Sequence, residues 1–220
     1  MLSDEQKIDM LYKYKKNKDK LSTKQIERIM SWVNDKNALV RYEVAECLIQ
    51  ENPANMKVLI RLGKDRDENV RIRAYTTLSS YSTKEAEVFL KKAMRKENRG
   101  ITLANAIGMW SAVTEKRGKN LEKKLKYIKH FEKKRKVKKS AACIQACRTA
   151  RYLFGETERL DKILKQMNHP NRRVRYNTLI DLEYIYNDEN KEKIIPYVKK
   201  ALKDSSKKVA MEARSILNYK

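Results

Sequence analysis

The chain has 220 residues, and 52 Lys and Arg against 28 Asp and Glu give it a net charge of +24. Only five Gly and three Pro occur, which excludes collagen-like, proline-rich and linker-type chains, while 41% hydrophobic residues suffice for a packed core. The sequence shows no run of 18 apolar residues and no signal-peptide core, so we expect no membrane span. Three cysteines, a small and odd number, favour a reducing compartment, and the cytoplasm is the expected location.

Amphipathic segments follow one another in pairs along the chain, and no segment alternates with the period of two that indicates a strand. The first helices of these pairs are expected at 24–33, 53–62, 84–94, 120–131, 158–167 and 191–202. Ser22 with Gln25, and Ser82 with Glu85, have the spacing of capping boxes. Gly63 is placed to end one helix, and Pro196 is expected to kink or restart another.

The second helix of each pair repeats one pattern, in which an aliphatic residue is followed by a small residue after four positions and by Leu after eight. Four segments fit it without gaps, starting at Val40, Val70, Val174 and Val209. Two weaker copies start at Ile101 and Val137. Residues four apart share one face of a helix, so each start predicts a helix with one buried stripe. Separations of 30 to 37 residues between the starts suit a repeat of two helices.

The best copy, DRDENVRIRAYTTL at residues 65–78, resembles the second helix of a HEAT repeat. The resemblance extends over roughly residues 22–220 and implies an all-α fold. That fold is a right-handed α-solenoid of about six HEAT-like helix pairs, with the second helices on the concave side. We expect a single domain over residues 1–220, with repeats at roughly 22–50, 53–80, 83–113, 117–154, 156–187 and 189–219. Stacking is required because one pair cannot bury its apolar stripe alone.

An arginine follows the first valine of three copies, as Arg41, Arg71 and Arg175. Such arginines either form a row of free cations in the groove or an inter-repeat ladder, bonded to an Asp of their own or a neighbouring turn. The ladder is favoured for Arg41 and Arg71, because Asp35 and Asp65 precede them by six residues. For Arg175, which has no such Asp, both interpretations stay open.

Basic residues are concentrated between Arg117 and Arg151, where 14 Lys and Arg face two acidic residues. Further clusters at 172–175 and 207–208 also enter second helices, so stacked repeats would align them along one rim. We interpret this rim as a polyanion-binding surface, with nucleic acid as the first candidate, held through phosphates without sequence specificity. The alternative is that the lysines only keep the protein soluble. The predicted contact residues are Lys133, Lys134, Arg135, Lys136, Lys138, Lys139, Arg172, Arg173, Arg175, Lys207 and Lys208.

Aromatic side chains could add stacking to this surface. Trp110 extends the second helix of the third repeat and is counted among the nucleic-acid-binding candidates. Tyr42 and Tyr176 occupy the same slot of their repeats and are expected to fill grooves between repeats instead. Cys143 and Cys147 are expected to be buried small side chains, because the chain offers no matching ligands for a metal site. We predict no metal and no cofactor.

The predicted function is that of a non-enzymatic binding module for nucleic acid or another polyanion. One alternative is a protein-interaction scaffold for an acidic partner. A second is a glycosylase similar to the HEAT-like alkylpurine DNA glycosylases, with Trp110 and Glu115 as its suggested site. No phosphate-binding loop and no hydrolase or metalloprotease motif occurs in the sequence. Asp181 and Glu183, the carboxylates nearest the basic rim, read as ordinary helix-surface residues.

Overall fold

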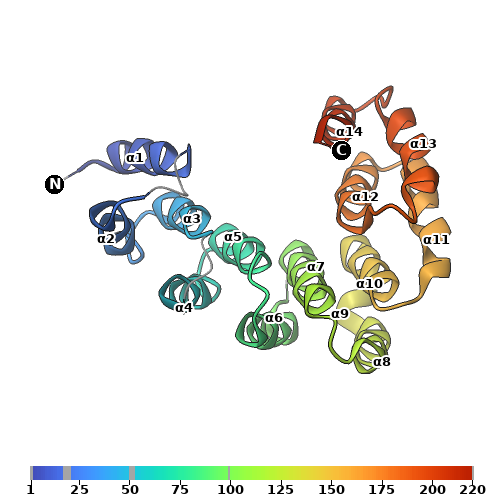
Figure 1. The fold of residues 1–220 in the computed structure, drawn as a ribbon, viewed down its shortest axis with the longest axis horizontal. Coiled ribbons are helices and arrows are strands. Elements are labelled where there is room, and N and C mark those ends of the chain that lie inside the picture. The colour runs from blue at the N-terminus through green and yellow to red at the C-terminus, as the bar shows by residue number, and fades with distance from the viewer. Residues whose placement is uncertain (1, 17–20, 50–52, 99, 220) are drawn as a thin grey trace. The chain divides into compact units, whose positions relative to one another are not determined.

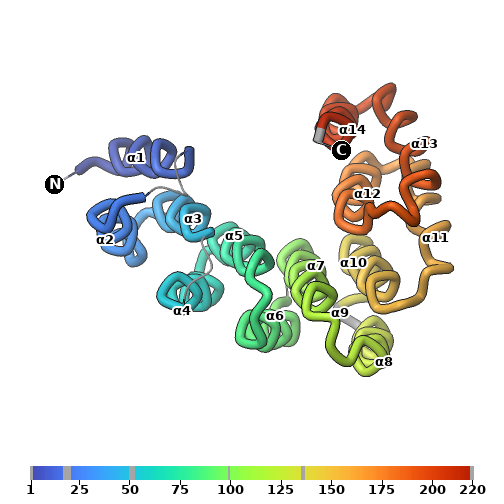
Figure 2. Tube along the Cα trace, in the orientation of Figure 1, coloured from blue at the N-terminus to red at the C-terminus, as the bar shows by residue number. Residues whose placement is uncertain are grey.

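The computed structural model describes residues 2–16, 21–49, 53–98 and 100–219. All regular structure in these residues is helical, which confirms the predicted all-α class (Figure 1). The chain divides into two compact units, Met1–Arg117 and Gly118–Lys220, which we call unit 1 and unit 2 (Figure 2). The single domain over 1–220 stays a prediction.

Unit 1 consists of two layers of helices (Figure 1). Neighbouring helices pack side by side in the second-helix layer, which contains α1 (Asp4–Lys16), α3 (Ala38–Cys47), α5 (Glu68–Leu78) and α7 (Gly100–Arg117). The first-helix layer contains α2 (Thr23–Ser31), α4 (Pro53–Leu62) and α6 (Lys84–Lys96). These pairs correspond to the first three predicted repeats.

Unit 2 repeats the same arrangement. Its second-helix layer contains α10 (Ala141–Leu153), α12 (Arg172–Ile185) and α14 (Lys207–Tyr219), each packed on the next. The other layer contains α8 (Leu121–Glu132), α13 (Lys191–Ala201) and the segment η2 (Thr157–Arg159), α11 (Leu160–Lys165) and η3 (Gln166–Asn168). The short helix α9 (Arg135–Lys138) connects α8 to α10. The helix expected at 158–167 is therefore divided into three short pieces.

Helix α1 was not part of any predicted repeat. Ser3 and Gln6 form reciprocal backbone-to-side-chain hydrogen bonds at its start, which is a capping box. The helix packs on α3 through Leu11, which is fully buried, and Tyr14. It therefore occupies the place of a second helix in the layer.

The predicted buried stripes of α3 and α5 are confirmed in full, whereas Val174 and Leu217 of the two strong stripes in unit 2 are only half-buried. Val40, Val44, Val70, Ala74 and their counterparts at Leu48 and Leu78 are all at most 2% exposed. In unit 2, the core gathers apolar residues from η3, α11, α12, α13 and α14, including Leu179, Leu182, Val209 and Ala213. The hydrophobic effect of burying these stripes between neighbouring helices holds each stack together.

The register of the two weak copies was wrong. Ile101 is 69% exposed, and the buried stripe of α7 instead contains Thr102, Ala106 and Trp110, one residue later. Val137 lies in α9, whereas the stripe of α10 starts six residues later at Cys143. Ser140 caps α10 by accepting a hydrogen bond from the Cys143 N–H, just as an Asn or Asp cap precedes the stripe by three residues in α3, α5 and α12.

The local signals had mixed outcomes. The capping box of Ser22 and Gln25 is confirmed, but α6 is capped by Thr83 rather than Ser82. Pro196 lies inside α13, which continues through it as one helix. Gly63 follows α4, but its backbone is not left-handed, so it does not form the glycine C-cap that the sequence predicted. A Cβ atom at Gly63 would lie 2.7 Å from the Phe89 ring, so the glycine is needed for close packing of α4 on α6.

Candidate binding surface

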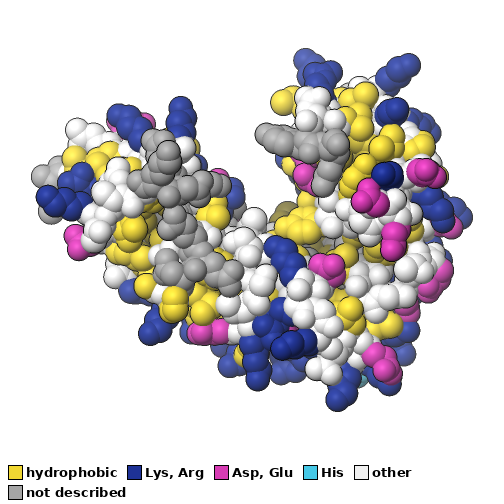
Figure 3. All heavy atoms as spheres, in the orientation of Figure 1, with side chains coloured by type: hydrophobic (Ala, Val, Ile, Leu, Met, Phe, Trp, Pro, Cys, Tyr) yellow, Lys and Arg dark blue, Asp and Glu magenta, His cyan; other side chains and the backbone are white. Residues whose placement is uncertain are grey.

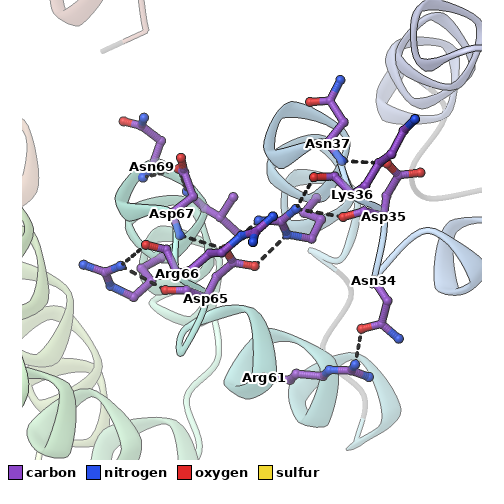
Figure 4. A network of polar contacts seen from close by, with 12 residues as sticks. Asn34, Asp35, Lys36, Asn37, Arg61, Asp65, Arg66, Asp67 and Asn69 are labelled. Atoms are coloured by element: carbon purple, nitrogen blue, oxygen red, sulfur yellow. Dashed lines mark hydrogen bonds and ion pairs between the residues drawn. The ribbon is translucent and has the colours of Figure 1, made fainter.

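The arginines that follow the first valine of the stripes in unit 1 form a ladder between repeats. The Nε and Nη2 atoms of Arg41 donate to both carboxylate oxygens of Asp65 at 2.7 and 2.8 Å, and Nη1 donates to the Asp35 carbonyl at 2.7 Å (Figure 4). Arg71 contacts Glu97 and the Asp65 carbonyl in the same way. Each arginine thus pairs with the carboxylate of the following repeat, while its own turn contributes a carbonyl group.

The same ladder includes residues that the sequence did not assign to it. Lys7 of α1, four residues after the Ser3 cap, contacts Asp35 at 2.7 Å. Arg175 binds Asp204 through two hydrogen bonds of 2.7 and 2.8 Å and donates to the His169 carbonyl at 2.8 Å. Arg175 is therefore a ladder residue, and its guanidinium is not a free cation for a phosphate. Of the two interpretations left open for Arg175, the structure supports the ladder.

The ladder changes the ionisation of its carboxylates. The bond from Arg175 holds the pKa of Asp204 below its usual range. Burial alone would raise the pKa of Asp65, but the bonds from Arg41 and from the Asp67 N–H outweigh it and lower the pKa. Both carboxylates therefore stay charged well into acidic solution, which keeps the repeats locked over a wide pH range.

Trp110 does not belong to a binding surface. Its side chain is fully buried in the stripe of α7, at the slot that Leu78 occupies in α5. A buried indole ring cannot stack on an exposed base, so we remove Trp110 from the nucleic-acid-binding candidates. The suggested pair of Trp110 and Glu115 also fails as a glycosylase site, because Glu115 is exposed while the ring is sealed in the core.

Most of the predicted lysines and arginines of unit 2 are exposed. Lys133, Lys134, Lys138 and Lys139 lie between α8 and α10, Arg172 and Arg173 are the first residues of α12, and Lys207 and Lys208 are the first of α14. The side chains of Arg135 and Lys136 lie outside the described residues. On the face shown in Figure 3, Lys and Arg side chains protrude at many places.

Basic residues of unit 2 are concentrated in three turns. We call the turns at 129–139, 165–175 and 199–208 together the turn edge; they contain 16 basic and two acidic residues. The segments 118–122, 151–161 and 185–192 contain four basic and seven acidic residues, and ion pairs of Lys129 with Glu156 and of Arg151 with Glu132 join one of them to the first turn. The second and third of these turns are in contact, through Arg175 with Asp204 and Lys200 with Asn168. The structure therefore places the turns at 165–175 and 199–208 side by side.

Local helix stability explains only part of this concentration of basic residues. Cations are favourable at helix C-termini and unfavourable at N-termini, because the helix dipole is positive at its N-terminal end. Arg172, Arg173, Lys207 and Lys208 lie at N-termini, against this preference. The first two residues of α3 are Ala and Leu, and those of α5 are Glu and Asn. The basic pairs of α12 and α14 thus have no role in stabilising their own helices.

The two tyrosines pack between repeats as expected. Tyr42 lies under Arg73, with the guanidinium carbon 4.7 Å from the ring centre, and Tyr176 lies under the Lys208 ammonium at 4.3 Å. Both rings are half-buried and connect neighbouring second helices. Such cation–π contacts orient the basic side chains at the surface.

A polar cluster between α10 and α12 was missed by sequence reasoning. The Gln145 Nε2 atom donates to Thr178 Oγ1 and to Asp181 Oδ2, both at 2.8 Å. Burial raises the pKa of Asp181 to about 7, although the bond from Gln145 opposes the shift. Asp181 is therefore not an ordinary surface carboxylate. The signal in the sequence was its position facing the preceding second helix, three residues after the buried Thr178.

The three cysteines are buried as free thiols, and burial raises the pKa of Cys47 to about 12. Across the described part of the chain, no group of three or more His, Cys, Asp or Glu side chains is arranged to hold a metal ion. None of the described helices combines the length and the apolar composition that crossing a bilayer requires.

Comparisons with known proteins agree with this architecture. The family model of HEAT repeats matches residues 26–109. A similar solved structure is the complex of CpcE and CpcF of phycocyanin lyase from Nostoc sp. PCC7120, with a TM-score of 0.63 and 16% sequence identity. The match covers 100% of this chain and 95% of that chain. A search of curated proteins gives no match.

Two stacks of paired helices, locked by a polar ladder at fixed positions, define a helical-repeat protein of the α-solenoid class. Within that class, residues 26–109 match the family model of HEAT repeats.

Proposed function

We propose that this chain is a non-enzymatic binding module that holds a polyanion, with nucleic acid as the first candidate, on the turn edge of unit 2. The supporting observation is the concentration of 16 basic and two acidic residues in three turns, of which those at 165–175 and 199–208 are in contact. The exposed pairs at the starts of α12 and α14 oppose the helix dipole, so the stability of their own helices does not explain them, although Lys208 also lies over the Tyr176 ring. Three buried free thiols suit the expected cytoplasmic location.

The size of the turn edge suits a phosphate backbone. Neighbouring packed helices lie about 8–10 Å apart, so three turns extend over about 20 Å. A DNA duplex presents one charge per about 1.7 Å of its axis, so several phosphates come within reach of the exposed cations. Six phosphate contacts predict a salt slope of about −5, which corresponds to roughly a thousandfold loss of affinity between about 50 and 200 mM salt.

The test is fluorescence anisotropy with a labelled random duplex across that range of salt. A variant with Arg172, Arg173, Lys207 and Lys208 all changed to Gln is expected to bind weakly and to reduce the salt slope by about three to four. The matched control removes the same charge from exposed lysines of unit 2 outside the turn edge, by changing Lys119, Lys123, Lys162 and Lys193 to Gln. The proposal fails if no duplex binds at about 50 mM salt, or if both variants lose the same affinity.

A protein partner is the second candidate. The similar solved structure is a complex of two proteins, CpcE and CpcF, and HEAT repeats suit a protein-interaction module. An acidic protein on the same turn edge would show a weaker salt dependence than a duplex, because no condensed counterions are released from it. Tight binding of an acidic protein with no binding of duplex would replace the first candidate by the second.

A further inference from the structure

Unit 1 contains a hollow that no part of the proposed function uses. It has a volume of about 620 Å³ and lies between the turn after α2 and the C-terminal half of α4. Besides the ladder residue Arg41, five cations line it: Lys36, Lys57, Arg61, Lys64 and Arg66. All five side chains are exposed, and Figure 4 shows Arg61 beside Asn34, with Lys36 and Arg66 in the two turns above them.

The acidic residues of the hollow are already occupied. Asp35 pairs with Lys7 and accepts a hydrogen bond from the Asn37 N–H. Asp65 pairs with Arg41 and accepts one from the Asp67 N–H. The ladder therefore neutralises both carboxylates from behind, and the side open to solvent retains an excess of positive charge.

The five cations that line the hollow are not held in ion pairs in the same way. Within the described residues, Lys36, Lys57, Lys64 and Arg66 form no ion pair with a carboxylate, and Arg61 contacts only the amide oxygen of Asn34. Four unpaired cations around one hollow repel each other, so an anionic ligand gains from relieving this repulsion. The helix dipole explains an isolated Lys or Arg at a helix C-terminus, but the end of α4 does not account for five cations around one hollow.

The floor of the hollow indicates the kind of anion. Val33, Ile60 and Leu62 contribute apolar lining, and Ile60 is half-buried rather than sealed in the core. A small inorganic anion would leave this apolar floor uncovered. An extended peptide presents alternate side chains to opposite sides, so its carboxylates can reach the rim while aliphatic side chains face the floor.

We infer that this hollow of unit 1 is a docking site for an acidic peptide segment in which carboxylate and aliphatic side chains alternate. Charge complementarity with the five cations gives attraction, and the apolar floor gives selectivity over other polyanions. The site is separate from the turn edge of unit 2, so neither proposal depends on the other.

The test uses the full chain and a fluorescein-labelled peptide of about eight residues that alternates Glu and Leu, long enough to extend over about 25 Å. Changing Lys36, Lys57, Lys64 and Arg66 to Gln is expected to weaken binding about tenfold or more. The matched control removes the same charge from exposed residues of α2 and α6, by changing Lys24, Arg28, Lys84 and Lys92 to Gln, and is expected to weaken binding less than threefold.

Two further probes test the chemistry of the ligand. A peptide that alternates Glu and Ser has the same charge and is expected to bind about tenfold more weakly, because it leaves the floor uncovered. Equal binding of the two peptides, equal loss in the two variants, or no peptide binding at low salt would overturn the inference. It would also be overturned if a single-stranded oligonucleotide of equal charge bound the same four residues more tightly. None of these results depends on whether unit 2 binds a duplex.

Discussion

The ladder predicts that Arg41→Ala strongly destabilises unit 1. The two side chains that pair here, Arg41 and Asp65, are only 6% and 10% exposed. Without the guanidinium, Asp65 keeps a single N–H donor from Asp67 and remains a poorly solvated charge. Breaking a buried pair in this way costs about 3–5 kcal/mol of the free energy of unfolding. Urea denaturation followed by tryptophan fluorescence measures it, because both tryptophans, Trp32 and Trp110, lie in unit 1.

A double-mutant cycle separates the pair from other effects. Asp65→Ala and the double variant complete the cycle, and we expect a coupling energy of about 1.5–3 kcal/mol, in the upper part of the range for residues in one network. The matched control is the pair Glu122 and Lys126, whose side chains are 78% and 75% exposed and whose coupling should be much smaller. A coupling for Arg41 and Asp65 no larger than that of the exposed pair would refute the view that the ladder locks neighbouring repeats.

Three further predictions concern the interior. Because the pKa of Asp181 is raised in the folded chain, the folded chain between about pH 4 and pH 7 keeps a proton that the unfolded chain has lost. The free energy of unfolding should therefore fall as pH rises through this window, and Asp181→Asn should remove this pH dependence. Unfolding titrations at pH 5 and pH 8 measure this, and an unchanged slope in the variant would contradict it. Gly63→Ala should cost about 1–3 kcal/mol by overpacking against Phe89, and Phe89→Leu should recover part of that loss in urea titrations; no recovery would count against the contact. Trp110→Ala should cost about 3–5 kcal/mol by circular dichroism, and a near-neutral result would show that the ring is not a core residue.

The sequence predicted the fold well where the buried stripe consists of aliphatic residues. Val40, Val70 and Val209 mark second helices that the structure confirms, because a stripe of valine and leucine is a strong helical signal. It failed where the slot holds Thr102 or Cys143, which look polar or ambiguous although both are fully buried. The helix cap was the better marker there, since Ser140 lies three residues before the stripe, as in the clear repeats.

The candidate surface was less predictable, because side-chain pairing depends on contacts between repeats. Nothing near Arg175 indicates a partner, and Asp204 becomes visible only when the acid is sought in the turn of the following repeat. Trp110 was misplaced because a register error of one residue moves a helical side chain by about 100° around the axis. The exposure of Arg172 and Lys207 was predictable from their position at helix starts, but their shared edge required the stacking of α12 on α14.

The ladder also explains why the repeats of this chain differ so much in length. Each ladder contact joins a second helix to the turn that precedes the next one, and the residues between the two partners number differently each time, with offsets of 24 for Arg41, 26 for Arg71 and 29 for Arg175. The ladder contact fixes where consecutive second helices meet. The first helix between them can therefore be longer, shorter or divided into pieces, as it is at η2, α11 and η3. Natural insertions and engineered grafts should therefore be tolerated within first helices and rejected within the short stretch from each acid to its arginine.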